Sequence, residues 1–314
     1  MLIKMAWSSV ISSLAPLHPN TAPTRYNSNF ILPCEFLTYG AISGFFIEGE
    51  ETIRLPEGIK YTSSGGLNIM SNTCRELILP STMTHFTQGT CNIPNLETLT
   101  ILSDTFTCSS MEFSGIIKHL NIDNCKYLYF DGSLRLDMEI LEFPATLELL
   151  TGVPTLNPNS HLKKIIFNGN TELRQSALYF SGNPTTVREL INIHLAFANS
   201  GGGVSGMNNL EKITFANNLP NSTTLNNYLA NKKYLRIVEL PNTLININAH
   251  ALWGTAISEI DIPASVEFIS YTAFKRCSNL RTMIVRATTP PTAEETDKKR
   301  VSNVCTIYVP AESL

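Results

Sequence analysis

The chain has 314 residues, of which only 16% are charged, and its formal net charge is -3. A typical soluble protein has about 25% charged residues, so solubility must depend on Asn, Thr and Ser. Nucleic acid is not an expected partner, because phosphate binding requires a basic patch and no Lys/Arg run is longer than the three residues at 298–300. No membrane span is expected either, since no stretch approaches the roughly 20 apolar residues that one needs.

Residues 1–48 are rich in Pro, Asn and aromatic side chains and do not fit the pattern that follows them. Residues 1–16 resemble a secretion signal only faintly, because serines interrupt the apolar run and Pro16 follows the plausible cleavage site. We therefore expect residues 1–48 to form an N-terminal cap on the first coil or an anchoring segment.

A short phrase recurs from residue 49 onward: an apolar residue, two polar residues, an apolar-x-apolar triplet and often a proline. The first residue of the triplet serves here as the marker of each copy, and subtraction of residue numbers gives steps of 21 to 25 residues. Such a period predicts a solenoid, because a unit that cannot bury its apolar face alone must stack on its neighbours. Twelve markers are recognised, at Ile53, Leu77, Leu99, Leu120, Leu141, Ile165, Leu190, Ile213, Val238, Ile260, Met283 and Ile307.

Each triplet predicts a short parallel strand whose marker and second-next residue face the core, while the residue between them faces solvent. The unit at Leu190 fits least well: Asn192 occupies an apolar place, and a one-residue slip would turn Ile191 and Ile193 inward instead. The second half of each unit is looser and predicts a helical turn or irregular coil. The residues three before the marker are also apolar and should form a further core ladder: Cys74, Leu96, Ile117, Met138, Leu162, Val187, Leu210, Leu235, Ile257, Leu280 and Val304. Prolines, which cannot continue a ladder of strands, are expected to end six strands, at Pro56, Pro80, Pro144, Pro241, Pro263 and Pro310.

Residues 260–280 read as an apolar strand ending in Pro, then Ser-Val, an apolar pair, Ala-Phe, Cys and Ser-x-Leu. This stretch resembles one repeat of the BspA-like leucine-rich family, and residues 287–292 with 306–314 are similar to the way many such proteins of gut Bacteroidetes end their arrays. The resemblance is specific across residues 235–314 and fades upstream to the strand phrase alone. It implies a ligand-binding or adhesive array without chemistry of its own, on bacterial surfaces or in virions of phages that infect such bacteria.

The expected fold is therefore a β-rich solenoid, a right-handed leucine-rich-repeat superhelix of about twelve coils of 21–25 residues. A parallel sheet should occupy one face, and short helical or irregular turns the other. The repeat array is expected over residues 49–289, and residues 290–314 should form a linker loop and the terminal repeat strand.

Charged residues of alternating sign occupy the position two before the marker, from Glu51 to Arg236. Seven of the eight neighbouring pairs are opposite in sign, and only Lys163 with Arg188 is alike. Because such a row cancels its own field, we interpret it as a ladder that fixes the register of the coils rather than as a recognition strip.

No residue pattern indicates catalysis, a metal or a cofactor. The Gly-x-Gly-x-x-Gly spacing at 201–206 lies in a turn between repeats rather than between a long strand and a helix, as a dinucleotide site requires. The histidines fall at unrelated phases of the repeat. The cysteines lack Cys-x-x-Cys pairs and are expected to be buried free thiols. They are Cys34, Cys74, Cys91, Cys108, Cys125, Cys277 and Cys305.

The leading hypothesis is a non-enzymatic recognition or adhesion module that binds a protein or glycan ligand through the exposed face of the sheet. Solvent-facing isoleucine is costly unless something covers it, so Ile166 and Ile191 are the expected contact patch. The alternative is a structural or receptor-binding component of a phage virion, docked through its N-terminal segment. Either role is extracellular. The candidate ligand-binding residues are Asn121, Glu142, Ile166, Ile191, Glu239 and Asp261.

The last strand, residues 306–309, is followed by only five residues. An open sheet edge and an exposed apolar cross-section invite another chain to add on. We therefore expect self-association or another partner at this C-terminal edge, or the charged loop 294–300 folded across it.

Overall fold

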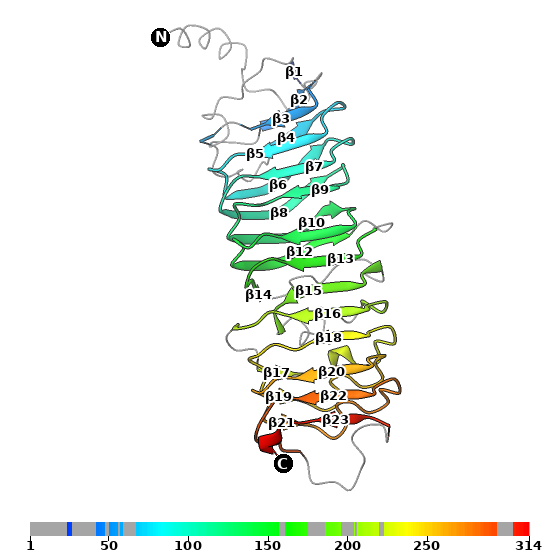
Figure 1. Ribbon diagram of the computed structural model, residues 1–314. Helices are drawn as coiled ribbons and strands as arrows, with labels where there is room; N and C mark the ends of the chain where they lie inside the picture. Colours follow the sequence, from blue (N-terminus) through cyan, green and yellow to red (C-terminus); the bar gives the residue numbers. More distant parts are fainter. Residues whose placement is uncertain are drawn as a thin grey trace.

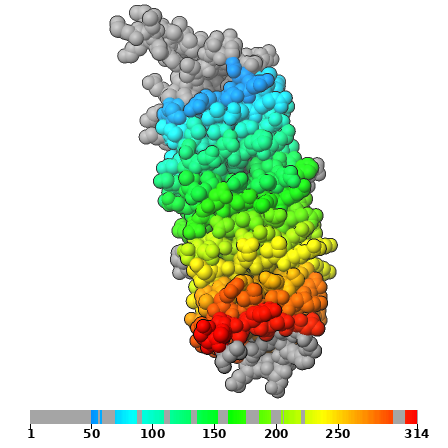
Figure 2. Space-filling model, viewed as in Figure 1, coloured from blue at the N-terminus to red at the C-terminus, as the bar shows by residue number. Residues whose placement is uncertain are grey.

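The computed structural model describes the backbone of residues 24–26 and 42–47, and residues 50–55, 57–58, 67–156, 161–174, 186–195, 204, 206–219, 223–293 and 304–313. The chain forms one elongated column of stacked coils, in which sequence neighbours lie one above the other (Figures 1 and 2). All strand pairs are parallel and join consecutive coils, which is the arrangement expected of a solenoid.

All twelve markers lie in short strands on one side of the column. These marker strands form three sheets, of four, five and three strands. They pair without offset at the markers, as Leu141 does with Ile165 in the next coil. The strands are β3 (Thr52–Arg54), β5 (Glu76–Leu79), β7 (Thr98–Ile101) and β9 (His119–Asn121); β11 (Ile140–Phe143), β13 (Lys164–Phe167), β15 (Glu189–Ile193), β16 (Lys212–Phe215) and β18 (Ile237–Glu239); and β20 (Glu259–Ile262), β22 (Thr282–Val285) and β23 (Thr306–Tyr308).

The second side of the column is a sheet as well, so the expectation of helical or irregular turns there is wrong for most of the molecule. Eight parallel strands form its upper part and three short strands its lower part. Among the residues that the structure describes, irregular turns on this side lie toward the C-terminal end, at 249–254 and 271–276. The second-side strands are β1 (Thr24–Tyr26), β2 (Ile42–Ile47), β4 (Leu67–Met70), β6 (His85–Asn92), β8 (Thr105–Phe113), β10 (Tyr127–Leu136), β12 (Leu149–Leu156) and β14 (Glu172–Arg174), followed by β17 (Thr224–Leu225), β19 (Asn246–Ile247) and β21 (Phe268–Ile269).

The solenoid class is confirmed, but twelve is too high a number of coils. The column has about 8 turns, and the longest sheet contains eight strands. The helical segments with described bounds are short 3-10 turns, η3 (Asn227–Leu229) and η4 (Ala311–Ser313).

The core is the predicted set of apolar ladders. Eleven of the twelve markers are buried or packed against the core, and so are the residues three before them, from Cys74 to Leu280. The last coil breaks the pattern: Val304, Ile307 and Val309 are 61%, 50% and 42% exposed. These positions are buried elsewhere because the next coil stacks on them, whereas β22 is the one strand among the described residues that pairs with β23.

Prolines end the strands as expected. Pro80, Pro144, Pro241, Pro263 and Pro310 follow marker strands, and each accepts a hydrogen bond from the amide three residues later. This bond closes a β-turn, which carries the chain away from the marker sheet. Pro56 lies outside the described residues.

The uncertain register at Leu190 is resolved by a bulge. Both Leu190 and Ile193 face the core, and the pairing of β15 with β16 shifts between them. Asn192 absorbs the extra residue with a positive φ of 57°, a conformation that Asn adopts more readily than most residues. Its side-chain amide donates to the carbonyl oxygens of Phe167 (2.9 Å) and Gly169 (3.2 Å) in the preceding coil. Ile191 therefore stays on the outer face without displacing Leu190.

Candidate functional site

The candidate ligand-binding residues divide among three sheets. Glu142, Ile166, Ile191 and Glu239 lie on the five-stranded marker sheet. Asn121 lies in β9 of the four-stranded sheet above it, and Asp261 in β20 of the three-stranded sheet below it. The site that the structure brings together is thus centred on the five-stranded sheet.

Strand alternation turns two residues of each strand in this sheet away from the core, the one before and the one after the marker. We call these ten residues the five-stranded face. Parallel strands lie about 4.8 Å apart, so five strands extend over about 19 Å. Its members, in pairs from β11 to β18, are Ile140 and Glu142, Lys164 and Ile166, Glu189 and Ile191, Lys212 and Thr214, and Ile237 and Glu239.

Four isoleucines lie on this face. Ile166 and Ile191 are register partners, so the predicted contact pair is adjacent, and both side chains are partly exposed. Ile140 and Ile237, at opposite ends of the sheet, are 49% and 48% exposed. Isolated surface isoleucines such as Ile140 and Ile237 are ordinary, so the adjacent pair Ile166 and Ile191 is the candidate apolar contact. The sequence analysis missed Ile140 and Ile237 because it considered only the residue after each marker.

Charged side chains separate the isoleucines and pair across neighbouring coils. Lys164 Nζ lies 3.1 Å from a carboxylate oxygen of Glu189, and Lys212 Nζ lies 3.4 Å from one of Glu239. Glu142 accepts a hydrogen bond of 2.7 Å from the side-chain amide of Asn168. The three carboxylates and two ammonium groups give the face a net charge of -1, so it has no strong field to steer a charged ligand.

The two flanking candidates are held by neighbours within their own sheets. Asn121 donates to the hydroxyl of Thr100 at 3.1 Å. Asp261 accepts two bonds from the guanidinium of Arg286, at 3.0 and 2.8 Å, and this carboxylate raises the pKa of Arg286 by hydrogen bonding and charge. Thr214, also on the five-stranded face, is 7% exposed, and its hydroxyl accepts a hydrogen bond from the backbone amide of Asn192. These contacts orient the side chains before any ligand arrives.

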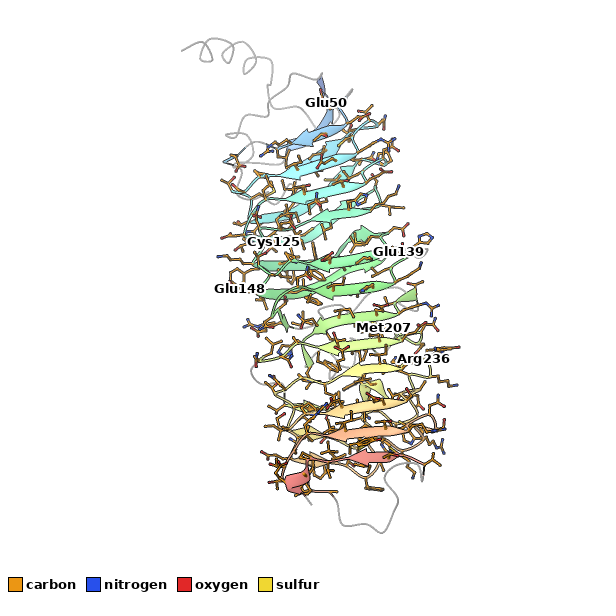
Figure 3. All side chains as sticks on the ribbon, viewed as in Figure 1. Glu50, Cys125, Glu139, Glu148, Met207 and Arg236 are labelled. Atoms are coloured by element: carbon orange, nitrogen blue, oxygen red, sulfur yellow. The ribbon has the colours of Figure 1, made fainter. Side chains whose placement is uncertain are left out.

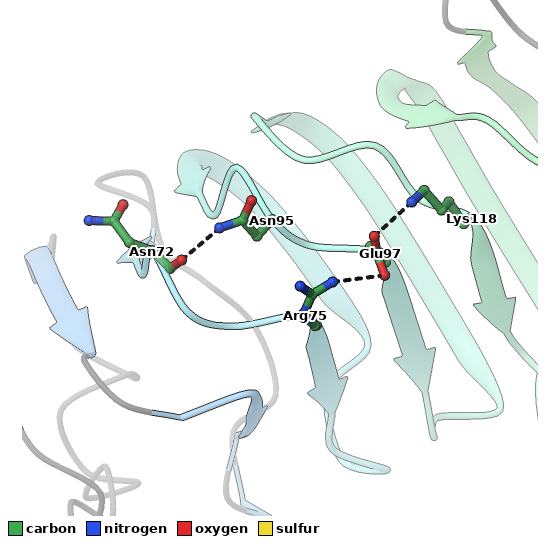
Figure 4. A network of polar contacts seen from close by, with 5 residues as sticks. All are labelled: Asn72, Arg75, Asn95, Glu97 and Lys118. Atoms are coloured by element: carbon green, nitrogen blue, oxygen red, sulfur yellow. Dashed lines mark hydrogen bonds and ion pairs between the residues drawn. The ribbon is translucent and has the colours of Figure 1, made fainter.

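The charged row two before the markers forms a chain of ion pairs along one edge of the column. Glu97 contacts Lys118 at 2.6 Å and Arg75 at 3.4 Å (Figure 4), and hydrogen bonds and charge from these cations lower its pKa. The like-charged neighbours Lys163 and Arg188 form ion pairs with different carboxylates, Lys163 with Glu139 and Arg188 with Glu211. In Figure 3, Glu139 and Arg236 mark this edge and Glu148 marks the other side. These pairs agree with a register-fixing role.

Groups capable of chemistry do not converge in the described part of the chain. No group of three or more His, Cys, Asp or Glu is placed to hold a metal ion there. Cys74, Cys91, Cys108, Cys125 and Cys277 are buried free thiols, as predicted, while Cys305 is partly exposed. Burial raises the pKa of Cys74 to about 11 and that of Cys125 to about 12, so these thiols are poor nucleophiles. Most of the glycine-rich stretch at 201–206, and Cys34, lie outside the described residues.

The stacked parallel strands define a β-solenoid with an outer sheet exposed on one side. Residues 203–293 match the BspA type leucine rich repeat region, with six copies of the repeat. Residues 203–293 thus carry the type of repeat that the phrase predicted. The match begins upstream of residue 235, where the sequence resemblance became specific, and it stops before the last strand.

Solved structures of bacterial repeat proteins are similar to the chain at low sequence identity. A leucine-rich repeat protein from Eubacterium ventriosum is 13% identical over 72% of this chain and 82% of its own, with a TM-score of 0.31. One from Bacteroides ovatus is 11% identical over 82% and 83%, with a TM-score of 0.32. The pneumococcal vaccine antigen PcpA is 14% identical over 88% and 72%, with a TM-score of 0.31. No curated protein sequence matches the chain.

Proposed function

We propose that the chain is a non-enzymatic recognition module that binds a protein ligand through the five-stranded face. The observation that carries this proposal is the adjacent pair Ile166 and Ile191, flanked by paired charges and by the half-exposed Ile140 and Ile237 at the two ends of the sheet. Protein interfaces combine an apolar centre with a polar rim that fixes orientation. The five-stranded face has both parts within one rigid sheet.

A protein fits this face better than a glycan does. Small-ligand sites are hollows lined by apolar and aromatic side chains with a few polar groups, whereas nine of the ten outward residues of the five strands are isoleucine or charged, and the tenth, Thr214, is 7% exposed. A width of about 19 Å matches an extended segment or a flat protein surface. We therefore propose a protein, of the two ligand classes that the sequence leaves open, as the ligand of this face.

An extracellular position, on a bacterial surface, suits an adhesive module of this family. No helix among the described residues is long and apolar enough to cross a membrane. The virion role stays a prediction, because it depends on residues 1–48, most of which lie outside the described part of the chain.

We also propose that the edge of β23 takes a partner strand. Tyr308 is 56% exposed on the outer face, and the core-side residues Val304, Ile307 and Val309 of the same coil are exposed as well. Edge strands offer unpaired backbone groups that template further pairing. The alternative cover, the loop at 294–300, lies outside the described residues.

Binding of labelled protein to a combined protein and glycan array tests the proposed function. The variants Ile166→Ser and Glu142→Gln should lose signal on protein spots bound by the wild type. Tyr129→Ser is a matched control, because Tyr129 is 38% exposed on the second side of the column, and it should bind like the wild type. The proposal is refuted if the wild type binds only glycan spots, or if Ile166→Ser and Glu142→Gln bind the protein spots as strongly as the wild type and Tyr129→Ser do.

A further inference from the structure

An open hollow of about 430 Å³ lies on the second side of the column, near its C-terminal end. In Figure 1, β17, β19 and β21 lie across the column from β18, β20 and β22. The hollow is therefore separate from the five-stranded face. Its lining consists of Asn226, Asn227, Tyr228, Asn248, Ala249 and Phe268.

The solenoid register assembles this lining from three consecutive coils. Thr224, Asn246 and Phe268 pair in sequence across β17, β19 and β21. Asn226 and Asn248 follow the first two strands at the same offset, and the 3-10 turn η3 adds Asn227 and Tyr228 beside them. Because the backbone of all three coils is hydrogen bonded into one sheet, the lining is formed before a ligand binds.

Two features of the lining define the chemistry of a ligand. None of the six residues carries a charge at neutral pH, so the hollow has no counter-ion for an ionic group. Two of them, Tyr228 and Phe268, are partly exposed aromatic residues, which provide flat apolar faces. A ligand for this hollow should be neutral, with a flat apolar face and polar groups around it.

The amide groups of the lining are oriented in advance. The side-chain nitrogen of Asn248 donates to the side-chain oxygen of Asn226 at 2.8 Å. An amide side chain has two donor hydrogens and an oxygen with two lone pairs, so this bond fixes Asn248 without exhausting its donors and acceptors. Asn227 is exposed at the rim. Neighbouring amides that both donate and accept match hydroxyl groups, which also do both.

We propose that this hollow binds one neutral sugar unit of a glycan. A pyranose ring has an apolar face of C–H groups for an aromatic ring and a rim of hydroxyls for the amides. The volume lies within the range of about 300–1,000 Å³ typical of small-ligand sites. This site is independent of the protein-binding face, and either proposal can fail without the other.

Saturation-transfer NMR on the full chain tests the site with methyl glycosides of glucose, galactose, mannose and N-acetylglucosamine, and with sialic acid as the charged comparison. We expect at least one neutral glycoside to bind at millimolar concentration with saturation strongest on its ring C–H protons. Ala249→Trp should weaken binding tenfold or more by filling the hollow, since Ala249 is exposed and its replacement removes no contact of the core. Asn248→Asp keeps the shape but loses donors, and should weaken binding severalfold.

Thermal unfolding of each variant shows whether it folds, and Ile166→Ser, on the five-stranded face, is the matched control that should bind sugar like the wild type. If Ala249→Trp does not fold, the affinity of Asn248→Asp for the glycoside tests the site instead. The proposal is overturned if no neutral glycoside binds, if only sialic acid binds, or if a folded hollow variant keeps wild-type affinity.

Discussion

The stacked pair Phe143 and Phe167 gives the sharpest test of how the coils hold together. The two residues are register partners in β11 and β13, with ring centroids 4.6 Å apart and planes at 11°. Their exposed fractions are 0% and 2%. Phe167→Ala removes a buried ring that the neighbouring coils cannot replace, so we expect a loss of about 3–5 kcal/mol in the free energy of unfolding. About 0.5–1.5 kcal/mol of this belongs to the ring pair itself.

Urea unfolding followed by circular dichroism measures this loss, and a double-mutant cycle with Phe143→Leu and Phe167→Leu isolates the coupling of the two rings. Ile237→Ala is the control, because Ile237 is about half exposed and should change stability by no more than about 0.5 kcal/mol. A loss below about 1 kcal/mol for Phe167→Ala, well under the usual cost of removing a buried aromatic ring, or a coupling of zero, would refute stacking between these coils.

Three further predictions follow from burial and exposure. In the native protein Cys305 should react with a thiol reagent before Cys74 and Cys125, whose pKa values burial raises to about 11 and about 12; equal rates would contradict their burial. Burial lowers the pKa of His194, against a smaller opposing effect of Glu172. The imidazole of His194 therefore binds a proton more readily in the unfolded chain than in the folded one, and the free energy of unfolding should decrease as the pH falls from 7 to 5. The slope should reach at most about 1.4 kcal/mol per pH unit, and His194→Gln should flatten it; an unchanged slope would refute this role. Light scattering should show association that protects the amides of 306–308 from exchange, whereas a strict monomer with freely exchanging amides would refute a partner at β23.

The marker strands could be predicted from sequence because the same apolar phrase recurs every 21–25 residues, whereas the second-side strands could not. In β6 the buried residues Phe86 and Cys91 are five apart, an odd spacing that hides strand alternation. The pairing of β10 shifts register between Asp131 and Arg135. Local irregularity of this kind weakens the alternation of apolar and polar residues in the sequence, although pairing with the strands of neighbouring coils still holds the segment extended.

The five-stranded face was partly predictable. Alternation from the marker places Ile166 and Ile191 outward, and the same rule applied to the residue before the marker would also have found Ile140 and Ile237. The pairing of Glu239 with Lys212 in the preceding coil depends on side-chain conformation rather than on sequence position. The hollow left a weaker signal, since Asn226 and Asn248 are one repeat step of 22 residues apart, by subtraction, but only the structure places Phe268 and Tyr228 beside them.

The most direct test of the central claim is the affinity of a protein ligand taken from the array for the double variant Ile166→Ser/Ile191→Ser, compared with the wild type by biolayer interferometry. Truncating two central apolar contacts of an interface should raise the Kd about 10-fold to 100-fold, since each factor of ten corresponds to about 1.4 kcal/mol. Tyr129→Ser, on the second side, should leave the Kd unchanged. A Kd for the folded double variant equal to that of the wild type would contradict recognition through the five-stranded face.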